Sequence, residues 1–204
     1  MLRQCVPSLI EHVGPIDTLI LVNDTGDRGY GDWLGWTFKQ FDEIVNHPQR
    51  LGLAGALRSA WTTALEYGPD YVFHVEGDFT FNCDVDLGGM VRILDANPML
   101  SQVSLKRQPV NDVEIAAGGY METSPGAYTQ QDGYVAQSLC YTFNPHIAPA
   151  DVIRLCLSEP NDGLERGITD TLLFYNFHFG IYGRIKDAPR IHHIGEKRSA
   201  EWRP

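Results

Sequence analysis

The sequence predicts an α/β fold in which a mostly parallel sheet is flanked by helices. Short apolar runs of strand length alternate along the chain with segments whose apolar residues recur at helical spacing. The run at residues 18–22, TLILV, is apolar throughout, which is typical of a strand buried on both faces of a parallel sheet. Polar and acidic residues directly follow two of the predicted strands, at the edge of such a sheet where ligands bind.

The first half of the chain is predicted to alternate between helices and strands as far as residue 105. Leu53, Leu57 and Trp61 recur at helical spacing and give the second helix an apolar face. The expected helices are residues 2–13, 53–66 and 87–96. The expected strands are residues 18–22, 41–45, 71–75 and 102–105.

The second half begins with a segment of different composition. Residues 112–132 are rich in Gly, Tyr, Ser, Thr and Gln, which predicts a long loop of the kind that often acts as a lid. Beyond this loop we expect strands at residues 134–143, 179–185 and 190–194 and helices at residues 149–157 and 164–177. Pro149 is suited to the start of a helix because it needs no backbone N–H there.

Length and composition indicate one globular domain. The chain has 204 residues, of which 43% are hydrophobic and 21% are charged, so it can bury a core. We expect a single domain with a donor half at residues 1–106 and an acceptor half and tail at residues 107–204.

The charge and the apolar runs exclude some classes of function. A net charge of −10 disfavours general binding to nucleic acid, whose phosphates such a surface repels. The four cysteines have neither zinc-site nor redox-pair spacing, so we expect free thiols. No run approaches the ~20 apolar residues of a membrane span, and no signal peptide opens the sequence. We therefore expect a cytoplasmic protein.

The triplet Glu76–Gly77–Asp78 carries the strongest chemical signal in the sequence. It comes directly after the predicted strand YVFHV, so two carboxylates lie close together at the end of a buried element. Unpaired, they would repel each other and be poorly solvated, whereas a divalent cation prefers carboxylate oxygens. The alternative is an acidic turn with no ligand.

TLILVNDTGD, followed by the triplet after YVFHV, resembles the large inverting family of GT-A glycosyltransferases. In that family a first acidic site binds the nucleoside, and a D-x-D-like motif binds a metal ion and the diphosphate. The resemblance places Asn23 and Asp24 at the nucleoside, and Glu76 and Asp78 at the metal. It covers roughly residues 2–78, and it implies a GT-A type sheet.

Arg50, Gly52 and Arg58 lie between the two motifs, where the family has a glycine-containing loop and a helix. Glycine permits close approach of the backbone to a ligand, and arginine suits phosphate. We expect these residues to meet the donor. For Arg58 the alternative is a solvated helix face.

The segment HHIG near the end of the sequence resembles the stretch in which some GT-A enzymes place a histidine ligand of the metal. Successive side chains of a strand point to opposite faces, so only one of the two histidines should face the site. We favour His193 over His192. Lys197 and Arg198 follow, and we expect them to cover the diphosphate.

An inverting transfer requires a carboxylate that takes the proton of the acceptor hydroxyl. The family places this base at a loop-to-helix junction after the metal motif, which corresponds to Glu165, with Asp170 as second choice. The alternative is that Asp162 caps this helix and Glu165 is only a favourable charge in its first turn.

The resemblance implies Mn²⁺ or Mg²⁺ as cofactor and a nucleotide-sugar donor, with a UDP-sugar favoured. The acceptor is a glycan, a protein or a modified nucleobase, as suits a bacterial or bacteriophage enzyme. The match begins at the helix after the family's first strand, so we expect the sheet to lack that strand. Either residues upstream of Met1 are missing or other residues complete the nucleoside pocket. The alternative functions are a sugar nucleotidyltransferase and a non-catalytic nucleotide- or glycan-binding module.

Overall fold

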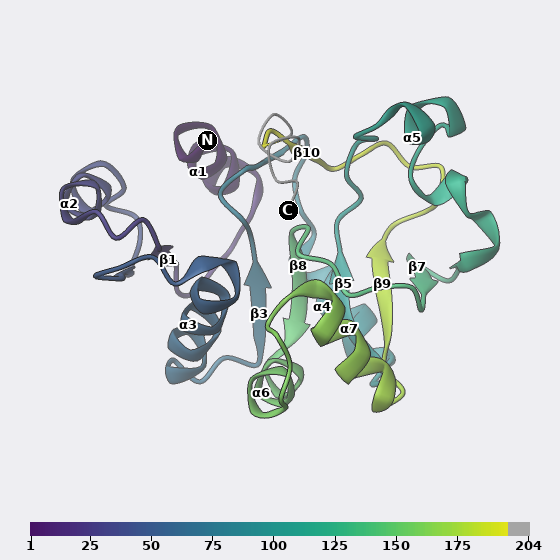
Figure 1. The fold of residues 1–204 in the computed structure, drawn as a ribbon. Coiled ribbons are helices and arrows are strands. Elements are labelled where there is room, and N and C mark those ends of the chain that lie inside the picture. Colours follow the sequence, from purple (N-terminus) through teal and green to yellow (C-terminus); the bar gives the residue numbers. More distant parts are fainter. Residues whose placement is uncertain (196–204) are drawn as a thin grey trace.

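Helices and strands alternate along most of the chain in the computed structural model, which describes residues 1–195 (Figure 1). The helices are α1 (Leu2–His12), α2 (Arg28–Thr37), α3 (Gly52–Glu66), α4 (Leu87–Ala96), α5 (Asp112–Ala117), α6 (Ala150–Ser158) and α7 (Glu165–Phe174). The strands are β1 (Ile20–Asn23), β2 (Glu43–Asn46), β3 (Tyr71–His74), β4 (Phe79–Phe81), β5 (Leu100–Ser104), β6 (Tyr128–Gln130), β7 (Tyr134–Gln137), β8 (His146–Pro149), β9 (His178–Tyr182) and β10 (Ile191–His193). Within the described range, no helix has the length and apolar character of a membrane span.

The main sheet has six strands in the order β3-β8-β5-β9-β7-β6. Only β5 and β9 pair in parallel, and the other four neighbouring pairs are antiparallel. The predicted α/β class is confirmed, but the expectation of a mostly parallel sheet is wrong. The predicted strands β3, β5 and β9 do run in one direction. The sheet is mixed for two reasons. A four-residue strand that the sequence did not reveal, β8, enters between β3 and β5 in the opposite direction. Strand β7 also runs antiparallel to both of its neighbours, β9 and β6.

Two smaller sheets stand beside the main one. Strands β1 and β2 pair in parallel, and β4 pairs with β10 in antiparallel register. Within residues 1–195 no strand joins β1 to β3 by backbone pairing, so the β1–β2 pair and the main sheet stay separate. This separation is consistent with the expected lack of one strand.

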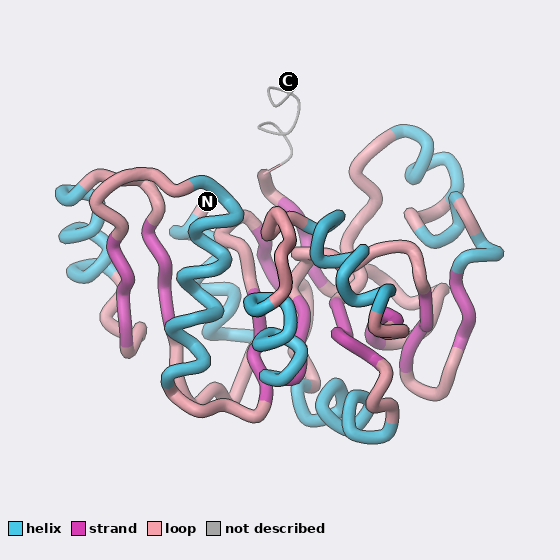
Figure 2. The backbone as a smooth tube through the Cα atoms, turned by 60° about the horizontal axis from the view of Figure 1, so that its bottom comes forward, coloured by secondary structure: helices cyan, strands magenta, loops and turns pink. Residues whose placement is uncertain are grey.

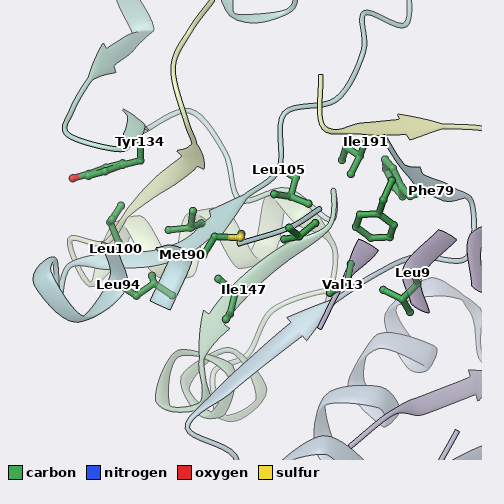
Figure 3. Close-up of a cluster of buried hydrophobic side chains, with 13 residues drawn as sticks. Leu9, Val13, Phe79, Met90, Leu94, Leu100, Leu105, Tyr134, Ile147 and Ile191 are labelled. Atoms are coloured by element: carbon green, nitrogen blue, oxygen red, sulfur yellow. The ribbon is translucent and has the colours of Figure 1, made fainter. Parts of the chain in front are cut away.

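Helices cover the main sheet on both faces, as Figures 1 and 2 show. Neighbouring residues of β8 face opposite sides, because side chains alternate along a strand. Ile147 packs in the cluster that contains Met90 and Leu94 of α4, whereas Ala148 packs with α3, α6 and α7. Figure 3 shows the first of these clusters, which also receives Leu9 and Val13 from α1 and its end.

The second half departs from the sequence prediction in several places. Residues 112–132 are not one long loop: they contain α5, two short 3-10 turns and β6. Asn111 caps α5 with its side chain, a signal that the glycine-rich composition obscured. The strand expected at residues 134–143 ends at Gln137, whose side-chain oxygen accepts hydrogen bonds from the Leu139 and Cys140 backbones and turns the chain. In the first half of the chain, helix α2 and strand β4 were not predicted.

A buried polar pair lies inside the core that α3, α6 and α7 form. The hydroxyl of Tyr141 donates to Nε2 of His146 over 2.6 Å, and Nδ1 of His146 donates to the Asn144 carbonyl over 2.9 Å. Burial is the main cause that lowers the pKa of His146 to about 3, so the imidazole is neutral in the fold. Each ring nitrogen therefore has one partner.

The variant Tyr141→Phe should lower the free energy of unfolding by about 1–3 kcal/mol, because it leaves a buried acceptor nitrogen without a donor. Denaturant unfolding at neutral pH measures this. The control is Tyr175→Phe, which removes the hydroxyl bonded to Glu159 at the surface and should change stability little. Equal stability of Tyr141→Phe and the wild type would contradict this account of the core.

Candidate active site

The loop between β3 and β4 carries the two carboxylates of the predicted metal motif. Strand β10 pairs with β4 so that His193 stands opposite Phe79, the residue after Asp78. Nε2 of His193 lies 3.1 Å from Oδ2 of Asp78, and the backbone N–H of Ile194 donates to the Asp78 carbonyl over 2.7 Å. Residues 115 positions apart in the sequence thus meet at the carboxyl end of β3.

Negative charge is concentrated here without full compensation. Oδ1 of Asp78 is buried and has no hydrogen-bond partner among the described residues. Burial raises the pKa of Glu76 to about 7, and the charges of Asp78 and Glu165 contribute to this shift. Since burial and neighbouring negative charge disfavour the ionised form of Glu76, a cation bound here would offset that cost.

Two side chains at this site have the donor atoms of metal ligands and lie together. Asp78 offers a carboxylate oxygen without a partner, and His193 offers an imidazole nitrogen. Within residues 1–195, no three such side chains converge as a complete metal site. His192 is exposed and points to the other face of β10, so the structure brings His193 rather than His192 to Asp78.

Glu165 is the first residue of α7 and borders the same region. Its Oε1 accepts a hydrogen bond of 2.7 Å from the backbone N–H of Phe143, which fixes the carboxylate at the start of the helix. Its charge raises the pKa of Glu76, as noted, and also that of Cys140, for which burial is the larger cause. Asp170 is exposed further along α7 and makes no hydrogen bond or ion pair with the described residues.

Asn23 and Asp24 are engaged by the chain itself. Asn23 is buried, donates to Asn46 and accepts from Thr25. Asp24 accepts hydrogen bonds from the backbone N–H groups of Leu51 and Gly52, over 2.7 and 2.8 Å.

A third donor to Asp24 is Nδ1 of His47, at 2.8 Å, while Nε2 of His47 lies 2.9 Å from the Ser59 hydroxyl. Burial tends to raise the pKa of Asp24, but the hydrogen bonds from Leu51, His47 and Gly52 outweigh it and lower the pKa. Asp24 therefore anchors the start of α3, which the sequence did not reveal. Whether it also contacts a nucleoside stays a prediction.

The other residues that we expect to contact the nucleotide-sugar donor do not share one environment. Gly52 has a φ of +77°, a backbone conformation that favours glycine, at the first residue of α3. Arg50 is exposed, and Arg58 donates to the Leu157 carbonyl at the end of α6 over 3.0 Å. Lys197 and Arg198 lie outside the described residues.

One residue that the sequence analysis did not single out contacts His193 directly. The side-chain amide of Gln108 donates to the His193 carbonyl over 3.1 Å and accepts from its backbone N–H over 2.9 Å. Nothing in the local pattern signals this role, because it depends on two segments that are far apart in the sequence.

Comparisons with known proteins yield a likeness of fold. No protein-family model and no curated protein sequence matches the chain. The structure of GalNAc-T7 with UDP, GalNAc and Mn²⁺ matches with a TM-score of 0.61 and 8% identity, over 93% of this chain and 40% of that one. UTP-bound UGPase from Acinetobacter baumannii matches with a TM-score of 0.55 and 15% identity, over 97% of this chain and 78% of that one.

The chain therefore spans less than half the length of the GalNAc-T7 chain. At these identities the likeness concerns the fold, and the GT-A type of α/β fold expected from the sequence is confirmed.

The variant Asp24→Ala should lower the free energy of unfolding by about 1–3 kcal/mol, because two backbone N–H groups at the start of α3 lose their acceptor. Thermal or denaturant unfolding measures this without any ligand. Asp151→Ala is the control, since that carboxylate is 92% exposed and its ion pair is with Arg154 at the surface. An Asp24→Ala protein as stable as the wild type would show that Asp24 is not an anchor.

Proposed function

We propose that this chain is a metal-dependent glycosyltransferase that moves a sugar from a nucleotide diphosphate to an acceptor hydroxyl. The observation that carries the proposal is the buried, unpartnered oxygen of Asp78 beside His193 and Glu76, at the carboxyl end of β3. Its surroundings hold excess negative charge, so a cation would stabilise them. The fold is also that of a glycosyltransferase whose structure contains UDP and Mn²⁺.

The proposed cofactor is Mn²⁺ or Mg²⁺. Asp78 and His193 would hold it, with Glu76 beside them, and diphosphate oxygens would complete the coordination. When bound, such a cation supplies positive charge that stabilises a departing diphosphate. Arg50, Lys197 and Arg198 stay predicted contacts of the diphosphate. Arg58 stays one as well, although its guanidinium is bonded to a carbonyl.

The proposed reaction is a direct displacement with inversion. The acceptor oxygen forms a bond to the anomeric carbon while the bond from that carbon to the diphosphate oxygen breaks. Glu165 takes the proton of the acceptor hydroxyl. Its Oε1 is held by the Phe143 N–H, so Oε2 is the oxygen proposed to receive the proton. Asp170 remains the second choice, although its position in the sixth residue of α7 directs it away from Glu165.

A UDP-sugar is the favoured donor, since two of the matching structures contain UDP or UTP. Asn23 and Asp24 are the proposed contacts of the nucleoside. Asp24 also anchors the start of α3. The acceptor is a glycan, a protein or a modified nucleobase. General binding to nucleic acid remains disfavoured by the net charge of −10.

A sugar nucleotidyltransferase is the second candidate, favoured by the likeness to UGPase over 97% of this chain. The two reactions differ in their products. A glycosyltransferase releases a nucleoside diphosphate from a nucleotide sugar, whereas a nucleotidyltransferase converts UTP and a sugar phosphate into a nucleotide sugar and pyrophosphate. Incubation with each substrate pair, with and without Mn²⁺, separates them. A chain that binds nucleotide and turns over neither pair would be a binding module.

Binding of UDP with Mn²⁺ should raise the melting temperature of the wild type by about 5–10 °C at ligand concentrations near a hundred times the dissociation constant. EDTA should abolish the shift. The variant Asp78→Ala should lose it because the buried oxygen is gone, whereas Asp84→Ala, an exposed carboxylate nearby in sequence, should keep it. A full shift in Asp78→Ala would contradict the proposed metal site.

The variant Glu165→Gln should reduce turnover by about 10²- to 10⁴-fold while leaving donor affinity largely unchanged. Glutamine keeps the size and the hydrogen bond from Phe143 but cannot take a proton. Asp170→Asn is the matched comparison and should keep most activity. NMR of the product determines the anomeric configuration. Retained configuration, or full activity in Glu165→Gln, would rule out the proposed inverting mechanism.

A further inference from the structure

Strand β10 is only three residues long, yet it carries the histidine of the proposed metal site. One edge of β10 pairs with β4. The other edge faces the segment that follows β5, where Arg107 forms a parallel bridge with Ile191 and the N–H groups of Arg190 and Ile191 donate to the Lys106 carbonyl. This second ladder would have to continue one step further to hold His193.

The backbone does not continue that ladder. In the register that pairs Arg107 with Ile191, the next backbone donor to the His193 carbonyl would be the N–H of Val110. That N–H is committed elsewhere, since it donates to Glu114 over 2.9 Å. The side-chain amide of Gln108 takes the place of the missing backbone groups. Its nitrogen donates to the His193 carbonyl, and its oxygen accepts from the His193 N–H, over 3.1 and 2.9 Å.

The backbone of Gln108 is itself held in place. Nη1 of Arg107 donates to the Gln108 carbonyl over 2.8 Å. The same guanidinium makes a two-point ion pair with Glu114 of α5, at 2.7 and 3.0 Å, and lies 4.8 Å from the centre of the Tyr120 ring. Both Arg107 and Glu114 are largely buried, so this brace ties Gln108 to α5 and to the turn after it.

We propose that Gln108 is a positioning residue, which holds β10 in the register at which the imidazole of His193 meets Asp78. The role rests on the proposed function, in which His193 binds the metal. Residues that orient a metal ligand without touching the metal typically contribute 10- to 100-fold to its affinity. Loss of the Gln108 amide should therefore weaken metal-dependent binding through His193 alone.

Isothermal titration of UDP into the protein in excess Mn²⁺ tests this. Gln108→Leu, which keeps the side-chain bulk and removes both hydrogen-bonding groups, should weaken binding about 10- to 100-fold. In a His193→Ala background the same change should cost nothing further, because the two residues act as one unit. An equal loss in both backgrounds, or no loss in either, would overturn the proposal.

Gln130→Leu is a matched control. Gln130 also bridges backbone groups, because it donates to the Tyr134 carbonyl and accepts from the Ile185 N–H, but it does so away from β10. This variant should bind UDP and Mn²⁺ as the wild type does. If Gln130→Leu lost as much affinity as Gln108→Leu, a general loosening of the fold would explain both, and the specific role of Gln108 would be wrong.

A second measurement separates this inference from the proposed function. In metal-free protein, hydrogen exchange of the His193 amide should become about tenfold faster in Gln108→Leu, because its acceptor is gone. If the wild type bound UDP equally with Mn²⁺ and with EDTA, the proposed function would fail. The exchange rate would still decide on the register: faster exchange supports the positioning of His193, and an unchanged rate contradicts it.

Discussion

Two carboxylates, Glu76 and Asp78, follow β3 directly, and contacts from distant parts of the chain gather around them. Glu76 and Asp78 are separated by a glycine whose Cβ would lie 2.8 Å from the Leu2 side chain, so the loop packs tightly against α1. The Cys5 thiol also contacts the Glu76 carbonyl. The pairing of β4 with β10 then brings His193 to Asp78, and α7 brings Glu165.

Much of the fold was predictable from local pattern. Helix α4 was predicted to the residue, and α1, α3 and α6 to within a residue at each end, since each has a clear apolar face. Strands β6 and β8 were not predicted. They are three and four residues long, and β8 ends at Pro149. Apolar runs this short also occur in loops, so they do not predict a strand. Because β8 separates β3 from β5 and β6 forms an edge of the sheet, the strand order could not be predicted without them.

The candidate site could be recognised in the sequence only where it follows a strand directly. The triplet at residues 76–78 was visible because a buried run leads into it. The structure brings His193 within 3.1 Å of Asp78, and metal binding by either residue stays a prediction. The anchoring of α3 by Asp24 and the support of His193 by Gln108 both join segments that lie 27 or more positions apart. Helical and strand periodicity describes neighbours in the sequence and cannot predict such contacts. The roles of Asp24 and Gln108 are therefore visible only in the three-dimensional structure.

We propose that a divalent cation compensates the excess negative charge at the end of β3. Anomalous diffraction at the manganese edge, from crystals grown with Mn²⁺ and UDP, locates such a cation at the atoms themselves. One strong peak is expected within coordination distance, about 2.0 to 2.6 Å, of Oδ1 of Asp78 and Nε2 of His193. A crystal that binds UDP and shows no manganese peak at these atoms would contradict it.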